Sequence, residues 1–224
     1  LLSMRDEINR RYAERQIEVA RELFGEEGYR YETDDLRRLN FATALDDTSH
    51  AEMRAMIERQ ADHLADTLFD APPEYFVIIA IPTPADSIRL LGNENVGGIY
   101  EHPRRRLISK DIGYLLRHEF THVMHWGHME RLKQTHPRWI QEGLATLYED
   151  YRFRSDGSVD FLPNNRHNIA KRLARIGRHM HFRDILTVDE QRFMREATQL
   201  YPQVRSMFMF LAAEGKLLPW YRAL

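Results

Sequence analysis

The chain contains no cysteine among its 224 residues. It therefore forms no disulfide bond and offers no thiolate to a metal ion. Any transition-metal site in this protein must use histidine and carboxylate side chains. The absence of cysteine does not fix the compartment, because a protein outside the cytoplasm need not carry disulfides.

A long apolar run is missing too. No stretch reaches the roughly 20 residues that a membrane-spanning helix needs, so we expect no transmembrane segment. The first residues also lack the basic start and apolar stretch of a signal peptide. The chain begins Leu1-Leu2-Ser3 rather than with Met, which is typical of a fragment whose leader or upstream domain has been removed. The compartment stays open, an extracytoplasmic one included.

The chain also lacks an excess of charge of either sign. The 32 Lys and Arg residues against 34 Asp and Glu leave a formal net charge of -2. No global basic field would recruit nucleic acid or an anionic membrane, so we expect no nucleic-acid partner. A composition that is 43% hydrophobic and 29% charged indicates one soluble globular unit with a sizeable core.

The hydrophobic pattern predicts a mixed α+β chain. Helix-spaced apolar residues predict helices, alternating or continuous short apolar runs predict strands, and Thr48 or Ser49 is expected to cap the second helix, with Glu52 completing a capping box. From about Arg138 onward the pattern is helical, apart from a polar loop at residues 155–166. The elements expected before that point are helices over 4–24, 48–69 and 84–91 and strands over 39–45, 75–81, 97–101 and 105–109. The last long helix is expected over 201–214.

One short motif carries most of the chemical information. In His118-Glu119-Phe120-Thr121-His122, two histidines four residues apart flank a glutamate. On a helix the two histidines project from one face on consecutive turns, close enough to share one tetrahedral zinc ion. Glu119 then lies beside the metal, where its carboxylate can accept a proton from water and pass it to a leaving group.

A catalytic zinc uses three protein ligands and one open position, so a third ligand is required. Glu142, within Trp139-Ile140-Gln141-Glu142-Gly143-Leu144-Ala145, is the strongest candidate. Its helix is expected to place apolar residues on one face and Glu142 with Thr146 on the other. Gly143 costs about 1 kcal/mol relative to Ala inside a helix. This is understandable if two helices approach closely around a metal, and the alternative is that the glycine is merely tolerated.

The motif followed after nineteen residues by Glu142, inside Trp-x-x-Glu-Gly-x-Ala, resembles the gluzincin metallopeptidases, the thermolysin-like and aminopeptidase-like branch of the zincins. The resemblance covers roughly residues 97–150. It implies one zinc per chain held by His118, His122 and Glu142, with Glu119 as general base and acid. It also implies that the strand near 98–101 is a cleft edge where an extended peptide could add as a strand. Thr146 stands where thermolysin-like enzymes carry an Asp, a departure that concerns the groups around the ligands.

A second zincin pattern competes for the third ligand. His125 and His128 continue the spacing of the motif and nearly match the metzincins, in which a third His follows a Gly that turns the chain. His125 occupies that Gly position, and a residue with a Cβ is disfavoured in the left-handed conformation of such a turn. If the helix continues instead, His125 shares the stripe of His118 but lies about 10 Å further along the axis, too far to reach the same zinc. We therefore favour Glu142, and expect His125, His128 and His136 to be surface or supporting residues.

Amide hydrolysis passes through an oxyanion that a donor near the metal must stabilise. Tyr201, in Tyr201-Pro202-Gln203-Val204-Arg205, resembles a late-helix tyrosine of related peptidases and is our first candidate for that donor. Arg166, His179 and His181 are weaker candidates. The run of arginines at 104–106 is interpreted as protection of an edge strand from aggregation.

Together these features predict an α+β, zincin-like fold, in which a small mixed sheet packs on the motif helix and a mainly helical C-terminal half supplies Glu142. We expect a helical extension over residues 1–30 and a zincin-like metallopeptidase domain over 31–224. The expected activity is zinc-dependent hydrolysis of a peptide or protein substrate. Two alternatives remain: a catalytically weak, zinc-stabilised interaction module, and a metal hydrolase of a non-peptide amide.

Overall fold

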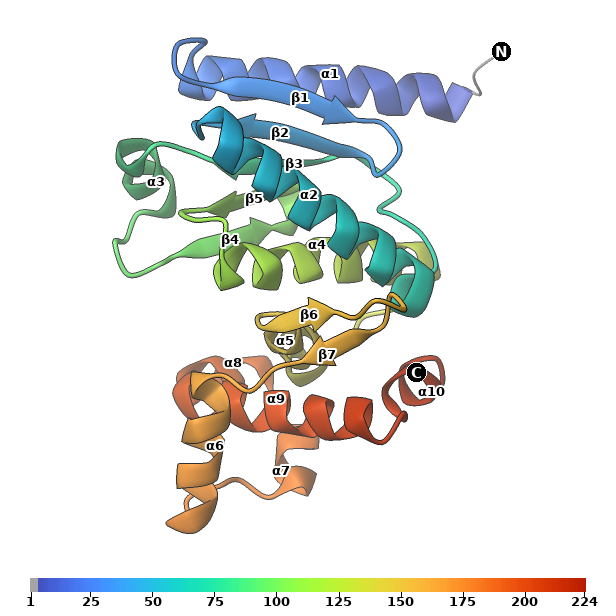
Figure 1. The fold of residues 1–224 in the computed structure, drawn as a ribbon, viewed down its shortest axis with the longest axis vertical. Coiled ribbons are helices and arrows are strands. Elements are labelled where there is room, and N and C mark those ends of the chain that lie inside the picture. The colour runs from blue at the N-terminus through green and yellow to red at the C-terminus, as the bar shows by residue number, and fades with distance from the viewer. Residues whose placement is uncertain (1–3) are drawn as a thin grey trace. The chain divides into compact units, whose positions relative to one another are not determined.

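The computed structural model describes residues 4–224 and divides into two compact units, the first ending at Lys133 and the second spanning Gln134–Leu224 (Figure 1). The first unit contains a five-stranded sheet with helices, and the second is mainly helical with a two-stranded sheet. The expected α+β class is confirmed. Within the described residues, no helix is long and apolar enough to cross a bilayer.

The sheet of the first unit is mixed, with the strand order β1-β2-β3-β5-β4. Its three inner strands run parallel, whereas β1 and β4 pair antiparallel at the two edges. The strands are β1 (Arg30–Asp34), β2 (Leu39–Thr43), β3 (Val77–Ile81), β4 (Gly98–Glu101) and β5 (Arg106–Ser109). The helices are α1 (Met4–Phe24), α2 (Asp47–Leu64), its π-helical continuation η1 (Ala65–Phe69), α3 (Pro84–Leu91), the 3-10 turn η2 (His102–Arg104) and α4 (Tyr114–Leu132).

The two central strands form the core of this unit. Every residue of β3 is buried, as the continuous apolar run predicted. Every residue of β2 is buried as well, so the expectation of a half-buried strand there was wrong. The reason is that both faces of β2 are covered, since Ala42 packs with Ala20 of α1 and Arg54 of α2 lies over the Phe41 ring on the other face. The polar strand β1 was not predicted, since its residues show no apolar alternation and it forms only by pairing with β2.

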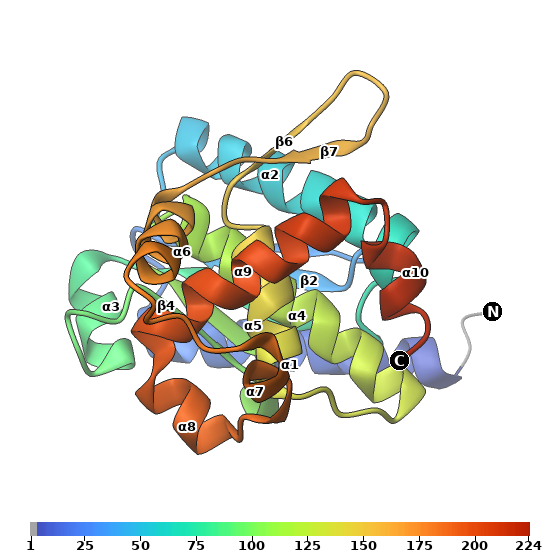
Figure 2. The same cartoon turned by 90° about the horizontal axis from the view of Figure 1, so that it is seen from below.

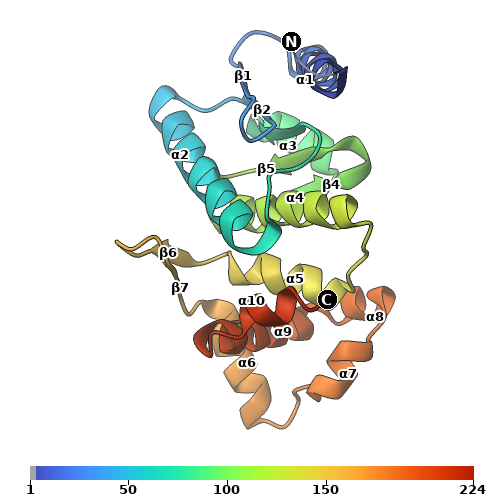
Figure 3. The same ribbon diagram turned by 90° about the vertical axis from the view of Figure 1, so that its right-hand side faces the viewer.

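Helices cover the sheet on both sides (Figure 3). On one side α1 packs through Ala20 on Ala42 of β2 and Ile78 of β3. On the other side α4 packs on β4 and β5, where Leu107 is fully buried. The register pairs Gly98 with Ser109 and Tyr100 with Leu107, so these residues share the face that α4 covers. The small mixed sheet therefore packs on the motif helix, as expected.

The start of α2 differs from the expectation. The N-cap is Asp46, whose carboxylate accepts a hydrogen bond from the Ser49 backbone N–H at 2.9 Å. Thr48 and Ser49 lie inside the helix, and the capping box with Glu52 was wrong. Asp is as good an N-cap as Ser, and Asp46 comes first along the chain. The Ser49 hydroxyl adds a second bond to the same carboxylate, at 2.8 Å.

The second unit is built on the pair α5 (Arg138–Leu147) and α9 (Ala197–Ala213), which pack on each other (Figure 2). The packing buries Trp139, Leu144, Val204 and Phe208. The remaining elements are β6 (Tyr151–Phe153), β7 (Val159–Phe161), α6 (Asn165–Arg175), α7 (Phe182–Thr187), α8 (Glu190–Arg195) and α10 (Leu217–Tyr221).

The hairpin of β6 and β7 corrects the expectation that residues 155–166 form one loop. The strands pair antiparallel through Arg152 and Asp160, whose side chains form an ion pair of 3.1 Å. Gly157 adopts a left-handed φ of 83° in the connecting turn, a conformation that glycine accepts without strain. Strands of three residues are too short to show alternation, so no periodic signal was available. The expected domain boundary after residue 30 stays a prediction.

Candidate metal centre

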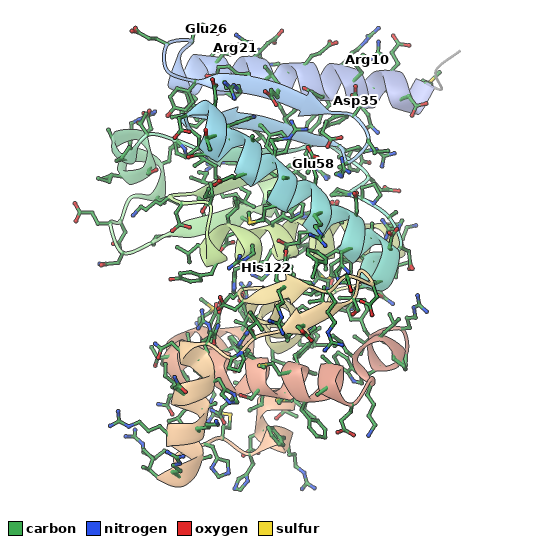
Figure 4. The ribbon with its side chains drawn as sticks, in the orientation of Figure 1. Arg10, Arg21, Glu26, Asp35, Glu58 and His122 are labelled. Carbon is green, nitrogen blue, oxygen red and sulfur yellow. The ribbon has the colours of Figure 1, made fainter. Side chains whose placement is uncertain are left out.

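The motif lies on α4 of the first unit. Leu116, Phe120 and Val123 are fully buried and form the core stripe of this helix. His118 and His122 are both 7% exposed, and their rings lie edge to face with centroids 5.0 Å apart. Figure 4 labels His122 on this helix. The two imidazoles therefore leave the same face on consecutive turns, as the spacing predicted.

A buried glutamine on α2 fixes the backbone of α4 at the motif. The Gln60 Nε2 atom donates to the Arg117 carbonyl at 3.0 Å and to the Thr121 hydroxyl at 3.0 Å. Thr121, one of the two residues between Glu119 and His122, donates its own hydroxyl to the Arg117 carbonyl at 2.9 Å. This network positions the turn that carries both histidines. No sequence pattern indicated this network, because Gln60 lies 61 residues from Thr121.

Glu119 lies beside the edge strand β4. Its side chain is half-buried, and its carboxylate makes no hydrogen bond or ion pair with any residue that the structure describes. A Cβ added at Gly98 would stand 3.2 Å from Glu119 Cγ and 3.2 Å from the Ile108 carbonyl oxygen. The glutamate therefore packs closely against the strand backbone while its carboxylate keeps its hydrogen-bonding capacity.

Glu142 lies on α5 of the second unit and is 3% exposed. Its Oε1 is 3.4 Å from Nη1 of Arg138, one helical turn earlier, a spacing at which such pairs meet. Arg138 also pairs with Glu190 of α8. The Thr146 hydroxyl donates to the Glu142 and Gly143 carbonyls at 2.7 and 3.1 Å, so the residue that replaces the expected Asp bonds the helix backbone.

Three candidate ligands form one group of side chains that could hold a metal ion. One nitrogen of His118, one of His122 and one carboxylate oxygen of Glu142 all lie within 4.8 Å of one another, and all three residues are buried. Two imidazoles and a carboxylate are a donor set that suits zinc and leaves a coordination position open. The donor chemistry and its burial therefore fit a zinc ion.

The competing ligands do not join this group. Helix α4 continues through Gly127 to Leu132, so the chain makes no turn before His128. The His128 Nδ1 atom lies 3.1 Å from the Phe69 carbonyl oxygen, and His125 stacks on the Phe69 ring at 5.4 Å. We expected these histidines to be surface or supporting residues, and the surface alternative does not hold, because both are buried on the side of α4 that packs on η1. Burial lowers the pKa of His128.

His136 is also buried, at 7% exposure, and its ring meets the ring of Tyr221 edge to face at 5.6 Å. Its Nε2 atom lies 3.3 Å from the side-chain oxygen of Gln134. The surface alternative therefore does not hold for His136 either. The packing of α10 on this end of the second unit explains the burial.

Tyr201 lies in α9 beneath the guanidinium of Arg166, which is 4.9 Å from the ring centroid. Arg166 in turn binds the buried Glu149 at 2.8 Å. These contacts hold the tyrosine ring, and its role as an oxyanion donor stays a prediction. His179 and His181 lie on an exposed segment with their rings 5.7 Å apart.

The three consecutive arginines at residues 104–106, which run from the end of η2 to the first residue of β5, are ion-paired. Arg104 and Arg106 both bind Glu101, and Arg105 binds Glu130 of α4.

Two features of the sequence could have indicated more of the site. The i,i+4 spacing of Arg138 and Glu142 was a usable signal for their ion pair that was missed. Gly98 was a weaker signal, because a glycine within a strand often marks a place where another group approaches the backbone closely.

A search with protein-family models finds no match to this chain. A search of curated proteins finds no match either.

Proposed function

We propose that this protein is a zinc-dependent peptidase in which His118, His122 and Glu142 hold one zinc ion. The observation that carries the proposal is the grouping of the three buried ligand atoms within 4.8 Å of one another. The resemblance of the same residues to the gluzincin pattern supports it. Glu119 supports the enzyme over a purely structural zinc site, because metal ligation does not require a carboxylate at that position.

Zinc bound by these residues would supply Lewis-acid chemistry, polarising a carbonyl and making a water molecule more acidic. The chain's own contribution is the movement of one proton. Glu119 accepts a proton from the attacking water as the new C–O bond forms, and returns it to the amide nitrogen as the C–N bond breaks. Its carboxylate has no partner among residues 4–224 that would compete for that proton.

The substrate proposal rests on β4, which is one of the two edge strands of the sheet. One side of β4 pairs with β5, and an extended peptide could pair with its other side by β-strand addition. Glu119 lies against Gly98 of this strand, so a peptide paired there would pass close to the general base. Tyr201, with its ring held by Arg166, is our candidate donor to the oxyanion.

The test combines zinc content with cleavage. We expect the purified protein to contain one zinc per chain by elemental analysis and to cleave members of a broad peptide library. Glu119→Gln should keep the zinc and lower the rate of cleavage roughly 10²- to 10⁴-fold, the usual contribution of a general acid or base. Glu52→Gln, a change of the same kind at an exposed position of α2, is the matched control and should alter neither quantity.

Retention of full cleavage by Glu119→Gln with its zinc in place would overturn the mechanism. Zinc without cleavage of any peptide would overturn the peptidase proposal and favour the interaction module or the hydrolase of a non-peptide amide. Absence of metal from every preparation would overturn the zinc site itself.

A further inference from the structure

The second unit carries a long segment without negative charge. Between Asp160 and Asp184 there is no acidic residue, in a chain whose net charge is -2. Basic residues crowd the same segment, which covers α6, the following loop and the start of α7. They are Arg166, Lys171, Arg172, Arg175, Arg178 and Arg183, with His167, His179 and His181 among them. We call residues 161–183 the basic segment.

Most cations of the basic segment lack an ion-pair partner. Only Arg166 is paired, with Glu149, and no carboxylate among the described residues lies within salt-bridge distance of the other five. Arginines elsewhere are commonly neutralised: Arg37 binds both Asp34 and Asp62. The five unpaired cations are all exposed, so their charge is directed at solvent or at a partner.

Helix α6 places three of these cations on one of its faces. At 100° per residue, Lys171, Arg172 and Arg175 fall on one face, and Ala170 and Leu173 fall on another. Helix α6 packs on α9, and Ala170 and Leu173 are less exposed than the three cations. The cationic face of α6 is therefore the face that the fold leaves open.

Exposed apolar side chains interleave with these cations. Ile176 is 54% exposed and Phe182 63% exposed, and both lie within the basic segment. Phe182 also lines an apolar groove of about 500 Å³ that continues over α9 and α10. Phe210, which is 60% exposed, also lines this groove. The other lining residues are Trp139, Leu186, Ser206, Met207, Leu211 and Trp220.

We propose that the basic segment and this adjoining groove bind the surface of an anionic phospholipid bilayer. Unpaired cations attract lipid headgroups, and exposed Phe, Ile and Leu side chains can enter the boundary between headgroups and acyl chains. A solvated surface would account for the charges but not for the large apolar side chains among them. A nucleic acid would also meet the cations, but aliphatic side chains such as Ile176 and Leu186 offer no stacking platform for its bases. The proposal is independent of the zinc site.

The test is sedimentation of the full chain with vesicles. We expect binding to vesicles of equal parts phosphatidylserine and phosphatidylcholine, weaker binding as salt is raised, and little binding to phosphatidylcholine alone. The triple variant Lys171→Gln, Arg172→Gln, Arg175→Gln should bind roughly a hundredfold more weakly, from about 1 kcal/mol per cation near the surface. Phe182→Ser should weaken binding without changing its dependence on salt.

The matched control removes three exposed arginines from α1, as Arg10→Gln, Arg11→Gln, Arg15→Gln, and should bind as the wild type does. Equal losses in the two triple variants would overturn the proposal, because binding would then follow net charge alone. Binding to a DNA duplex but not to the phosphatidylserine vesicles would overturn it in favour of a nucleic-acid partner. Circular dichroism of each variant shows whether a loss of binding reflects loss of the fold.

Discussion

Two helices supply the candidate ligands, and they differ in how they are built. Helix α4 has 19 residues and separates an apolar stripe from its histidine pair. Helix α5 has 10 residues, and every one from Trp139 to Leu147 is buried. In α4 the positions of the ligands follow from spacing alone. In α5 no exposed face remains, so the environment of Glu142 is set by the tertiary packing of its unit.

The difference shows what each helix needs in order to hold a ligand. On α4 the ligand turn is tied down by Gln60 from α2, through two hydrogen bonds. On α5 the carboxylate is met by Arg138 of its own helix, and the helix is fixed by close contact of Gly143 with Phe208 of α9. Helix α4 is thus held at its ligands by polar hydrogen bonds, and helix α5 is held mainly by apolar packing.

The largest effect is expected when a ligand is removed from either helix. His122→Ala and Glu142→Ala should each weaken zinc binding roughly a thousandfold or more, since total zinc-binding free energies of about 10–16 kcal/mol are shared among a few ligands. Zinc affinity can be measured by competition with a chelator. His128→Ala is the control and should keep its zinc. Loss of zinc from His128→Ala, with retention by Glu142→Ala, would refute the assignment of the third ligand.

The next effect concerns the packing of α5 alone. A Cβ at residue 143 would lie 2.3 Å from Cε2 of Phe208, a fully buried ring. Although Ala is the better helix former, Gly143→Ala should lower the free energy of unfolding by about 1–3 kcal/mol, because overpacking a core forces side chains out of place. Urea denaturation of the metal-free wild type and variant measures this difference in the free energy of unfolding.

A double-mutant cycle identifies the cause of that loss. Phe208→Leu opens the space that the new methyl group requires, so the combined cost of Gly143→Ala and Phe208→Leu should be smaller than the sum of the two single costs. Additive costs would show that Phe208 is not the obstacle, and the contrast between a helix held by packing and one held by polar bonds would fail.

The same contrast explains how much the sequence could predict. The histidine pair, the core stripe of α4 and the buried run of β3 follow from periodicity, and each was predicted. Glu142 was selected through resemblance to a family pattern. Gly143 left open whether two helices approach closely or the glycine is merely tolerated, and the partner that it meets is Phe208, 65 residues further along the chain.

The errors have a shared physical origin. For His125 and His128 the surface alternative was left open, because a helix pattern shows a polar residue but not the element that covers it. Both are buried by the packing of α4 on η1, where Phe69 contacts the two rings. Strand β1 was missed for the same reason, since its polar residues form a strand only beside β2. Local periodicity carries no information on such distant partners.

The smallest expected effect tests whether β4 positions the general base on α4. In Gly98→Ala, the new methyl group would be 3.2 Å from the Ile108 carbonyl oxygen and 3.2 Å from Glu119 Cγ. The backbone of β5 is held by the sheet, so the glutamate side chain must shift by a few tenths of an ångström. Because small displacements of a reacting group lower rates steeply, we expect cleavage to fall roughly tenfold with zinc binding unchanged.

Ile99→Ala is the matched control for this prediction. Ile99 lies in the same strand, its side chain leaves the opposite face of the sheet, and it is 42% exposed, so its truncation should leave cleavage intact. Equal losses in both variants would indicate a general effect on β4. Full activity of Gly98→Ala would mean that the strand does not hold Glu119, and the positioning of the general base would then depend on α4 alone.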